Sequence, residues 1–219
     1  MKKFLTTLTI LMMLPLTGFA AGGYNIELEK ANNSLEDKDS LKRGAILFSE
    51  YCMACHSLKY MRYNRIARDL GWEDEDVVAY MTYNQNKPVD TVMTRMLPGV
   101  DKEVLGTQVP DLSLMARLKG TDYIYSFLRG YEVDEKTGEW DNKLLHGTSM
   151  PNVLEGMQRH MTAEEYDQAT RDITNFLEYV GEPAKLKRHD LGWKVLLFLL
   201  VLIVISYLLK KEYWRDVKH

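Results

Sequence analysis

The sequence predicts a mostly α-helical domain that is exported and then held at a membrane by one C-terminal helix. Three observations carry this prediction. Apolar residues recur at intervals of three and four in several segments, which is the spacing of one helix face. Residues 191–209 form an apolar run long enough to cross a bilayer. The five residues from Cys52 to His56 form a covalent attachment motif whose chemistry belongs outside the cytoplasm in bacteria.

The start of the chain is typical of a secretory signal peptide. Two lysines follow the initial methionine, residues 4–16 are an apolar run, and small residues then suit cleavage after Ala20. An uncleaved anchor is the alternative, but the run is short for a membrane span. We therefore expect residues 1–20 to be a signal peptide and residues 21–190 to be a domain in the periplasm.

The second apolar segment is typical of a transmembrane helix. Residues 191–209 would form a helix of roughly 28 Å, close to the thickness of a bilayer core. Its one charge, Lys194, lies one turn from the end and can reach the headgroups, and Trp193 and Tyr207 lie where interfacial aromatic residues belong. Basic residues flank both ends, so the signal peptide decides the orientation. We expect a single-pass protein of the bacterial inner membrane, with residues 210–219 as a cytoplasmic tail.

The net charge of the exported domain limits the classes of partner that it can bind. The chain has 219 residues and a net charge of −3, but residues 24–190 hold 21 basic and 29 acidic side chains, a net charge of −8. Such a domain repels nucleic acid and anionic lipid, and it would attract a basic protein. Acidity kept for solubility alone is an equally good explanation. Nucleic acid is therefore not expected among the partners.

Cys52, Cys55 and His56 match the attachment pattern of a c-type haem. Two thiols separated by two residues on one turn reach the two vinyl groups of a single porphyrin, and the next imidazole then faces the iron. A redox dithiol, half of a zinc site and a chance match are the alternatives. A dithiol does not need His56, and a zinc site needs further Cys or His at suitable spacing, which the sequence does not show. One covalently attached haem c is therefore the expected cofactor.

The segment before the motif is expected to be a helix that runs directly into it. Ser40 suits the N-cap of this helix. The apolar stripe that follows, with spacings of four, three and four, is Leu41, Ala45, Phe48 and Cys52. Gly44 on this helix is explained by a close helix crossing. After the motif, Gly71 ends one segment, the acidic residues 73–76 open a helix, and a short helix is expected over Asp90–Met96.

The second half of the domain gives clearer helix boundaries. Helices are expected before and after Gly120, and residues 132–142 are typical of a turn or small hairpin. The most strongly marked helix spans Thr162–Val180, where Glu165 completes a capping box with the first residue. No segment shows a strong strand pattern, so the domain is expected to be mostly helical.

A second iron ligand decides whether such a haem binds small molecules or only carries electrons. Methionine is a soft ligand that favours ferrous iron and raises the potential. Among twelve methionines, Met150 lies between Gly147 and Pro151, in a loop suited to bringing one side chain to a flat ring. Core filling is the alternative for any single methionine, and His146 is a rival ligand in the same loop. An open iron face, as in a peroxidase or a gas-binding sensor, is the alternative from another class.

The order of these features resembles the cytochrome c1 family, which supplies the haem subunit of ubiquinol–cytochrome c reductase. The matching pieces cover nearly the whole mature chain. They are CMACHSLKY, PDLSLMAR, DYIYSFLRGY, NKLLHGTSMPNVL, FLEYVGEP and KLKRHDLGWKV, followed by a single C-terminal anchor. The resemblance implies a mostly α fold, namely a cytochrome c-type haem domain with one C-terminal transmembrane helix.

The resemblance also implies roles for particular residues. Haem attachment and iron ligation fall to Cys52, Cys55, His56 and Met150, with the last two as the proximal and distal ligands. Arg117 resembles the propionate-binding arginine of the family, and a guanidinium is a suitable neutraliser for a buried carboxylate. Pro110 and Tyr123 are expected to line the haem pocket.

The resemblance further implies a function in electron transport in a respiratory chain. The chain would carry single electrons from a Rieske iron–sulfur protein to a soluble or anchored cytochrome c, in a dimeric complex with cytochrome b. It would then be an electron-transfer subunit of an oxidoreductase complex and not catalytic alone, because quinol chemistry belongs to cytochrome b. The alternative is a membrane-anchored cytochrome c of another respiratory chain, which would purify without cytochrome b and a Rieske protein.

Overall fold

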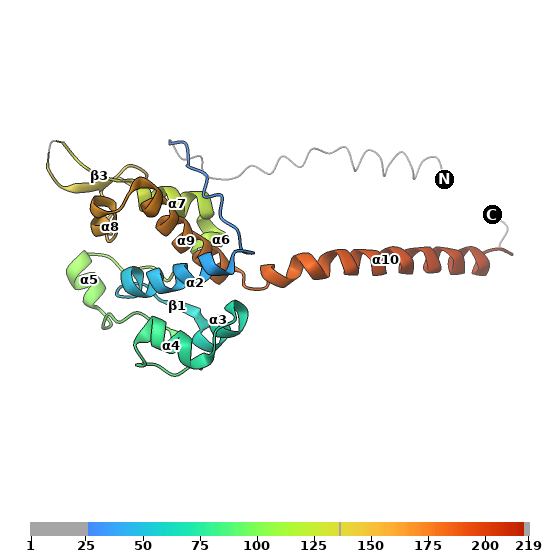
Figure 1. The fold of residues 1–219 in the computed structure, drawn as a ribbon. Coiled ribbons are helices and arrows are strands. Elements are labelled where there is room, and N and C mark those ends of the chain that lie inside the picture. The colour runs from blue at the N-terminus through green and yellow to red at the C-terminus, as the bar shows by residue number, and fades with distance from the viewer. Residues whose placement is uncertain (1–25, 136, 217–219) are drawn as a thin grey trace.

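The computed structural model describes residues 26–135 and 137–216, and it shows a helical domain from which one long helix leads away (Figure 1). The helices are α2 (Lys38–Leu47), the π-helical turn η1 (Phe48–Cys52), α3 (Tyr63–Leu70), α4 (Asp74–Thr82), α5 (Val100–Leu105), α6 (Met115–Lys119), α7 (Thr121–Arg129), α8 (Glu155–His160), α9 (Ala163–Gly181) and α10 (Lys185–Tyr213). The strands are β1 (Leu58–Arg62), β2 (Thr91–Val92), β3 (Tyr131–Val133) and β4 (Trp140–Asn142). The prediction of a mostly α chain with one apolar C-terminal helix is confirmed. The expected signal peptide, residues 1–20, lies outside the described residues.

The crossing of α2 and α9 forms the centre of the core. The ring of Phe48, directly after α2, lies 5.8 Å from the ring of Phe176 on α9, and both side chains are fully buried. Gly44 approaches α9 so closely that a Cβ atom there would lie 2.1 Å from the carbonyl oxygen of Asp172. The close crossing expected from Gly44 is confirmed. This crossing fixes the direction of α2 and therefore the position of Cys52, which follows α2 in the chain.

A buried carboxylate ties the same two helices together. Asp172 accepts a hydrogen bond from Ser40 Oγ at 2.6 Å and pairs with Arg43 Nε at 2.7 Å. The prediction of Ser40 as the N-cap is wrong, because Asp37 caps α2 and accepts from the backbone N–H of Ser40 at 2.9 Å. Aspartate caps a helix as well as serine does, so the helix begins earlier than expected. The Ser40 hydroxyl is then available to bind Asp172.

The segment after α4 is extended where a helix was expected. The predicted helix over Asp90–Met96 is wrong, because β2 pairs with β1 and Val92 is completely buried. Adjacent β-branched residues, Thr91 and Val92, suit a strand better than a helix. The residues that follow β2 return to the Cys52–His56 turn, as described below.

The hairpin and the capped helix expected in the second half are confirmed. Strands β3 and β4 pair antiparallel, and Gly138 in the connection has a positive φ of 73°, which glycine adopts readily. At the start of α9, Thr162 Oγ1 accepts from the Glu165 N–H at 3.2 Å, and the Glu165 carboxylate accepts from the Thr162 N–H at 2.9 Å.

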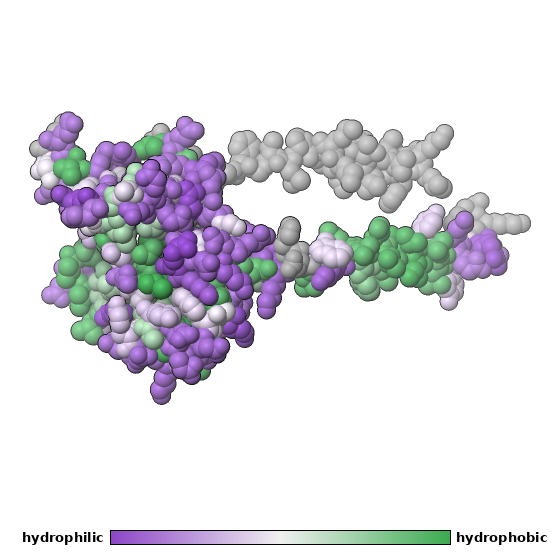
Figure 2. Space-filling view, viewed as in Figure 1, coloured by the Kyte–Doolittle hydropathy of each residue, from purple (hydrophilic) through white to green (hydrophobic). Residues whose placement is uncertain are grey.

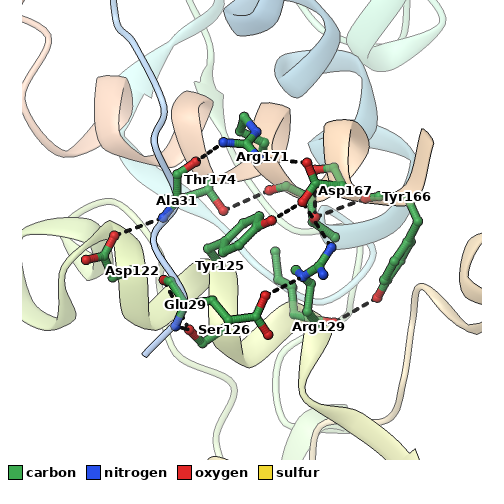
Figure 3. A network of polar contacts seen from close by, with 12 residues as sticks. Glu29, Ala31, Asp122, Tyr125, Ser126, Arg129, Tyr166, Asp167, Arg171 and Thr174 are labelled. Carbon is green, nitrogen blue, oxygen red and sulfur yellow. Dashed lines mark hydrogen bonds and ion pairs between the residues drawn. The ribbon is translucent and has the colours of Figure 1, made fainter. Parts of the chain in front are cut away.

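An N-terminal arm before α2 is fastened across α7 and α9 (Figure 3). The N–H of Ala31 donates to Asp122 Oδ1 at 3.0 Å. Arg129, at the end of α7, pairs with Glu29 of the arm at 3.0 Å and with Asp167 on α9 at 3.1 Å. These contacts join the arm, α7 and α9 into one unit, and this unit carries the hairpin and the loop that follows it.

Helix α10 carries the apolar segment. Its part Leu191–Tyr213 reaches a mean hydropathy of 2.4, and its most apolar stretch is not buried against the domain. Figure 2 shows this stretch as a continuous hydrophobic surface beyond the polar domain. By length and composition α10 can cross a membrane, as expected for residues 191–209.

Candidate haem site

The attachment motif closes a short turn at the end of η1. The N–H groups of Cys55 and His56 both donate to the carbonyl oxygen of Cys52, at 3.1 and 2.8 Å. Cys52 is buried and Cys55 is partly exposed. Both thiols therefore belong to one turn of the chain, which is the arrangement that attachment to a single porphyrin requires.

His56 is held by a backbone carbonyl. Its side chain is buried, and its Nδ1 lies 2.8 Å from the carbonyl oxygen of Pro110. A carbonyl only accepts hydrogen bonds, so Nδ1 carries the proton and Nε2 keeps its lone pair for a metal. Burial lowers the pKa of His56, which favours the neutral ring that binds iron. Pro110, which was expected to line the pocket, lies beside His56 and orients its ring.

A loop that the sequence did not mark holds the turn in place. Thr94 Oγ1 donates to the carbonyl of Ala54 at 2.9 Å, and the N–H of Arg95 donates to that of Met53 at 3.1 Å. The N–H of Thr94 also donates to Ser57 Oγ at 2.9 Å. No spacing pattern identifies Thr94 or Arg95, because they act through contacts that only the fold creates. They fix the backbone on which the two cysteines and His56 are mounted.

The structure argues against two alternative interpretations of the motif, a redox dithiol and half of a zinc site. Burial raises the pKa of the Cys52 thiol to about 12, whereas a redox dithiol needs a thiol whose pKa is lowered. Among residues 26–135 and 137–216, no group of three or more His, Cys, Asp or Glu side chains could hold a metal ion. A zinc site needs such a group. A buried thiol of raised pKa does not suit thiol redox chemistry, whereas two thiols on one turn suit attachment to a single porphyrin.

The loop between β4 and α8 carries Met150. This side chain is half-buried and packs against the hydrophobic core that includes Cys52. The carbonyl oxygen of Met150 accepts a hydrogen bond from the Tyr131 hydroxyl at 2.8 Å. The rival His146 has a side chain that is 74% exposed, and its Nδ1 lies 2.9 Å from Asp141 Oδ2. The structure thus turns Met150 towards the core and His146 towards solvent.

The segments after β2 and after Pro110 also carry exposed apolar side chains. These side chains are Met93, Leu97, Leu114 and Leu118. Figure 2 shows hydrophobic surface on the domain among polar residues. The fit to a haem rests on the donor set, which is two thiols on one turn and a buried imidazole whose Nε2 is left for a metal.

Comparison with known proteins agrees with this geometry. The model of the family described as "Cytochrome C1 family" matches residues 29–217, which is nearly the whole described chain. The chain belongs to the cytochrome c1 family. Proteins of this family carry a covalently bound haem c, and the Cys52–Cys55 pair fits the attachment motif. The cofactor prediction is confirmed.

Individual relatives cover most or nearly all of the chain. A cytochrome c1 of Allochromatium vinosum is 37% identical over 99% of this chain and 100% of its own length. An ammonia monooxygenase gamma subunit of Nitrosomonas europaea is 36% identical over 99% of both chains. A cytochrome c1 of Rhodospirillum rubrum is 31% identical over 84% of both chains.

Arg117 and Tyr123, which the family resemblance implies in the haem pocket, lie on α6 and α7. Arg117 Nη1 pairs with Glu182 Oε2 at 2.5 Å, and the Arg117 side chain is 56% exposed. Tyr123 is half-buried, with its ring stacked 6.1 Å from the ring of Phe127. The roles of Arg117 at a propionate, of Tyr123 in the pocket and of Met150 as a ligand stay predictions.

Proposed function

We propose that this chain takes single electrons from a Rieske iron–sulfur protein and passes them to a cytochrome c, within a ubiquinol–cytochrome c reductase. Proteins of the cytochrome c1 family are membrane-anchored subunits of the cytochrome bc1 complex. The main support for the proposal is that His56 is buried and oriented for an iron. Pro110 holds its Nδ1 and leaves Nε2 for iron, directly after two cysteines of the same turn.

His56 and Met150 are the proposed iron ligands, and Cys52 and Cys55 are the proposed thioether positions. The bound haem supplies the one-electron chemistry. His56 is fixed by Pro110 and Met150 lies on a loop held to the domain, so neither needs to move between the two oxidation states. With the Met150 thioether and the His56 imidazole as its two ligands, a haem held here would favour the ferrous state and have a high potential.

Charge near the haem edge is the second proposed influence on the potential. Arg117 is proposed to neutralise a propionate, since a guanidinium is matched to a carboxylate in shape and charge. Its present partner, Glu182, lies at the end of α9 just before the membrane helix. Pro110 and Tyr123 are proposed to line the pocket.

The proposed placement in the bacterial inner membrane follows from the two apolar segments. Residues 21–190 would form the periplasmic domain, residues 191–209 the membrane span and residues 210–219 the cytoplasmic tail. The apolar, unburied helix α10 supports the span. The order of signal peptide, domain and anchor in the sequence supports the orientation.

Cytochrome b is the proposed neighbour in a dimeric complex. A relative from Bradyrhizobium diazoefficiens named "Cytochrome b/c1" is 26% identical over 82% of this chain, and this chain covers 34% of that protein. Its name joins cytochrome b with cytochrome c1, which supports such an assembly. The proposed role of this chain is to relay electrons, and quinol oxidation is assigned to cytochrome b.

A second candidate function is suggested by one relative. The Nitrosomonas europaea protein bears the name of an ammonia monooxygenase gamma subunit. It aligns over 99% of this chain, as the Allochromatium vinosum cytochrome c1 does. This fits the alternative of a membrane-anchored cytochrome c that serves another respiratory chain. The partners that bind the chain distinguish the two functions.

Purification of the tagged full-length chain from membranes in mild detergent tests the choice. We expect cytochrome b and a Rieske protein to follow the chain, with quinol–cytochrome c reductase activity that the separated chain lacks. An untagged strain, carried through the same steps, controls for unspecific binding. Retention of subunits of another oxidase or of a monooxygenase, without cytochrome b, would contradict the proposal and favour the second candidate.

A further inference from the structure

The loop that carries Met150 has little regular structure of its own. It begins after β4 at Asn142, and it ends where α8 starts at Glu155. A side chain that must stay on a haem iron needs a backbone that does not drift. A residue outside the loop must therefore fix the backbone at Met150.

Tyr131 makes that contact. Its side chain is only 4% exposed, and its hydroxyl donates to the carbonyl oxygen of Met150 at 2.8 Å. The ring stands edge-on to Phe127 with centroids 5.7 Å apart. The backbone of Tyr131 is itself held, because Gln158 Nε2 on α8 donates to its carbonyl oxygen at 3.0 Å. At the other end of the loop, Tyr131 pairs with Asn142 in the β3–β4 hairpin, so Tyr131 connects both ends of the loop to Met150.

The element that carries Tyr131 is firmly anchored. The carbonyl of Phe127, near the end of α7, accepts from Asn142 Nδ2 at 2.8 Å, and the carbonyl of Leu128 accepts from the Tyr166 hydroxyl at 2.9 Å. Arg129 then pairs with Asp167 on α9 (Figure 3). These contacts hold the chain just before Tyr131 from two sides. A hydroxyl mounted there can hold a loop in one position.

We infer that Tyr131 is a positioning residue for the distal face of the haem, where its hydroxyl holds the backbone of Met150 so that the thioether stays on the iron. The inference rests on the proposed ligation by Met150. It predicts that Tyr131 affects how easily Met150 leaves the iron. It does not make Tyr131 a ligand, because the hydroxyl is used by the carbonyl of Met150.

The test is cyanide binding to the ferric full-length protein, since cyanide must displace the distal ligand. Tyr131→Phe removes only the hydroxyl, and one hydrogen bond of this kind corresponds to about a fivefold change in an equilibrium. We expect cyanide to bind about fivefold more tightly and the methionine–iron band to weaken. Tyr179→Phe is the matched control, because its buried hydroxyl bonds Asp69 at 3.1 Å between α9 and α3. This control should bind cyanide as the parent does.

A double variant separates this inference from the proposed ligation. With Met150→Leu already present, Tyr131→Phe should leave cyanide binding unchanged, because no thioether remains to be held. If Met150→Leu alone keeps the methionine–iron band, the ligation is wrong and the inference falls with it. If Met150→Leu removes the band but Tyr131→Phe binds cyanide as the parent does, the ligation stands and the role of Tyr131 is refuted.

Discussion

Replacing Met150 by leucine should remove the methionine–iron charge-transfer band of the ferric haem and lower its reduction potential. Leucine nearly keeps the volume of the side chain but offers no sulfur to the iron. Axial ligands set haem potentials over a range of about 0.8 V, so we expect the potential to fall by on the order of 100 mV or more. Absorption spectroscopy of the ferric protein and a redox titration measure the two effects.

Met157 offers a matched control for this substitution. It is a buried methionine on α8, in the same region of the chain, with a side chain that is 5% exposed. Met157→Leu exchanges one core-filling side chain for another of similar volume, which costs less than about 1.5 kcal/mol. The band and the potential should both survive. A Met150→Leu protein with the same band and potential as the parent would show that another residue closes the iron.

Replacing Gly44 by alanine should lower the free energy of unfolding by about 3 kcal/mol or more, at the upper end of what overpacking costs. The added Cβ would lie 2.1 Å from the carbonyl oxygen of Asp172 and 2.8 Å from Cβ of Phe176. Neither neighbour is the flexible end of a side chain, so α2 must move away from α9. Because α2 leads into η1 and Cys52, we also expect less haem attached per chain. Thermal unfolding and haem content measure both effects.

Gly156 is the control glycine. It lies in helix α8, and a Cβ atom there would meet nothing within 4 Å. Gly156→Ala should therefore be neutral or stabilising by up to about 1 kcal/mol, as expected for alanine in a helix. If Gly44→Ala were tolerated as well as Gly156→Ala, the close crossing of α2 and α9 would not be a feature of the protein in solution.

Much of the fold could be predicted because residues close together in the sequence determine where its helices begin and which face they bury. The capping box at Thr162 and the apolar stripe that ends at Cys52 depend on residues close together in the sequence, and both are confirmed. The two errors have different causes. Ser40 is not a cap because Asp37, three residues earlier, caps α2 and leaves the Ser40 hydroxyl to bind Asp172. Residues 91–92 form a strand because β1 offers them a partner.

In the site too, features of neighbouring residues could be predicted, whereas contacts between distant residues could not. The Cys52–His56 motif could be identified because covalent attachment imposes a fixed spacing on neighbouring residues. Pro110 was expected near the haem from resemblance, and the structure adds that its carbonyl orients His56. Thr94 and Tyr131 could not be predicted, because their contacts with Ala54 and Met150 involve backbone carbonyls, which carry no sequence signature.

We propose that the haem iron of this chain is closed on both faces and serves electron transfer. Exposure of the reduced, purified full-length protein to carbon monoxide tests this closure. We expect an unchanged absorption spectrum for the parent, and a carbon monoxide complex for Met150→Leu, in which the distal position would be open. A carbon monoxide complex in the native parent would show that one face of the iron is open, as in haem proteins that bind small molecules.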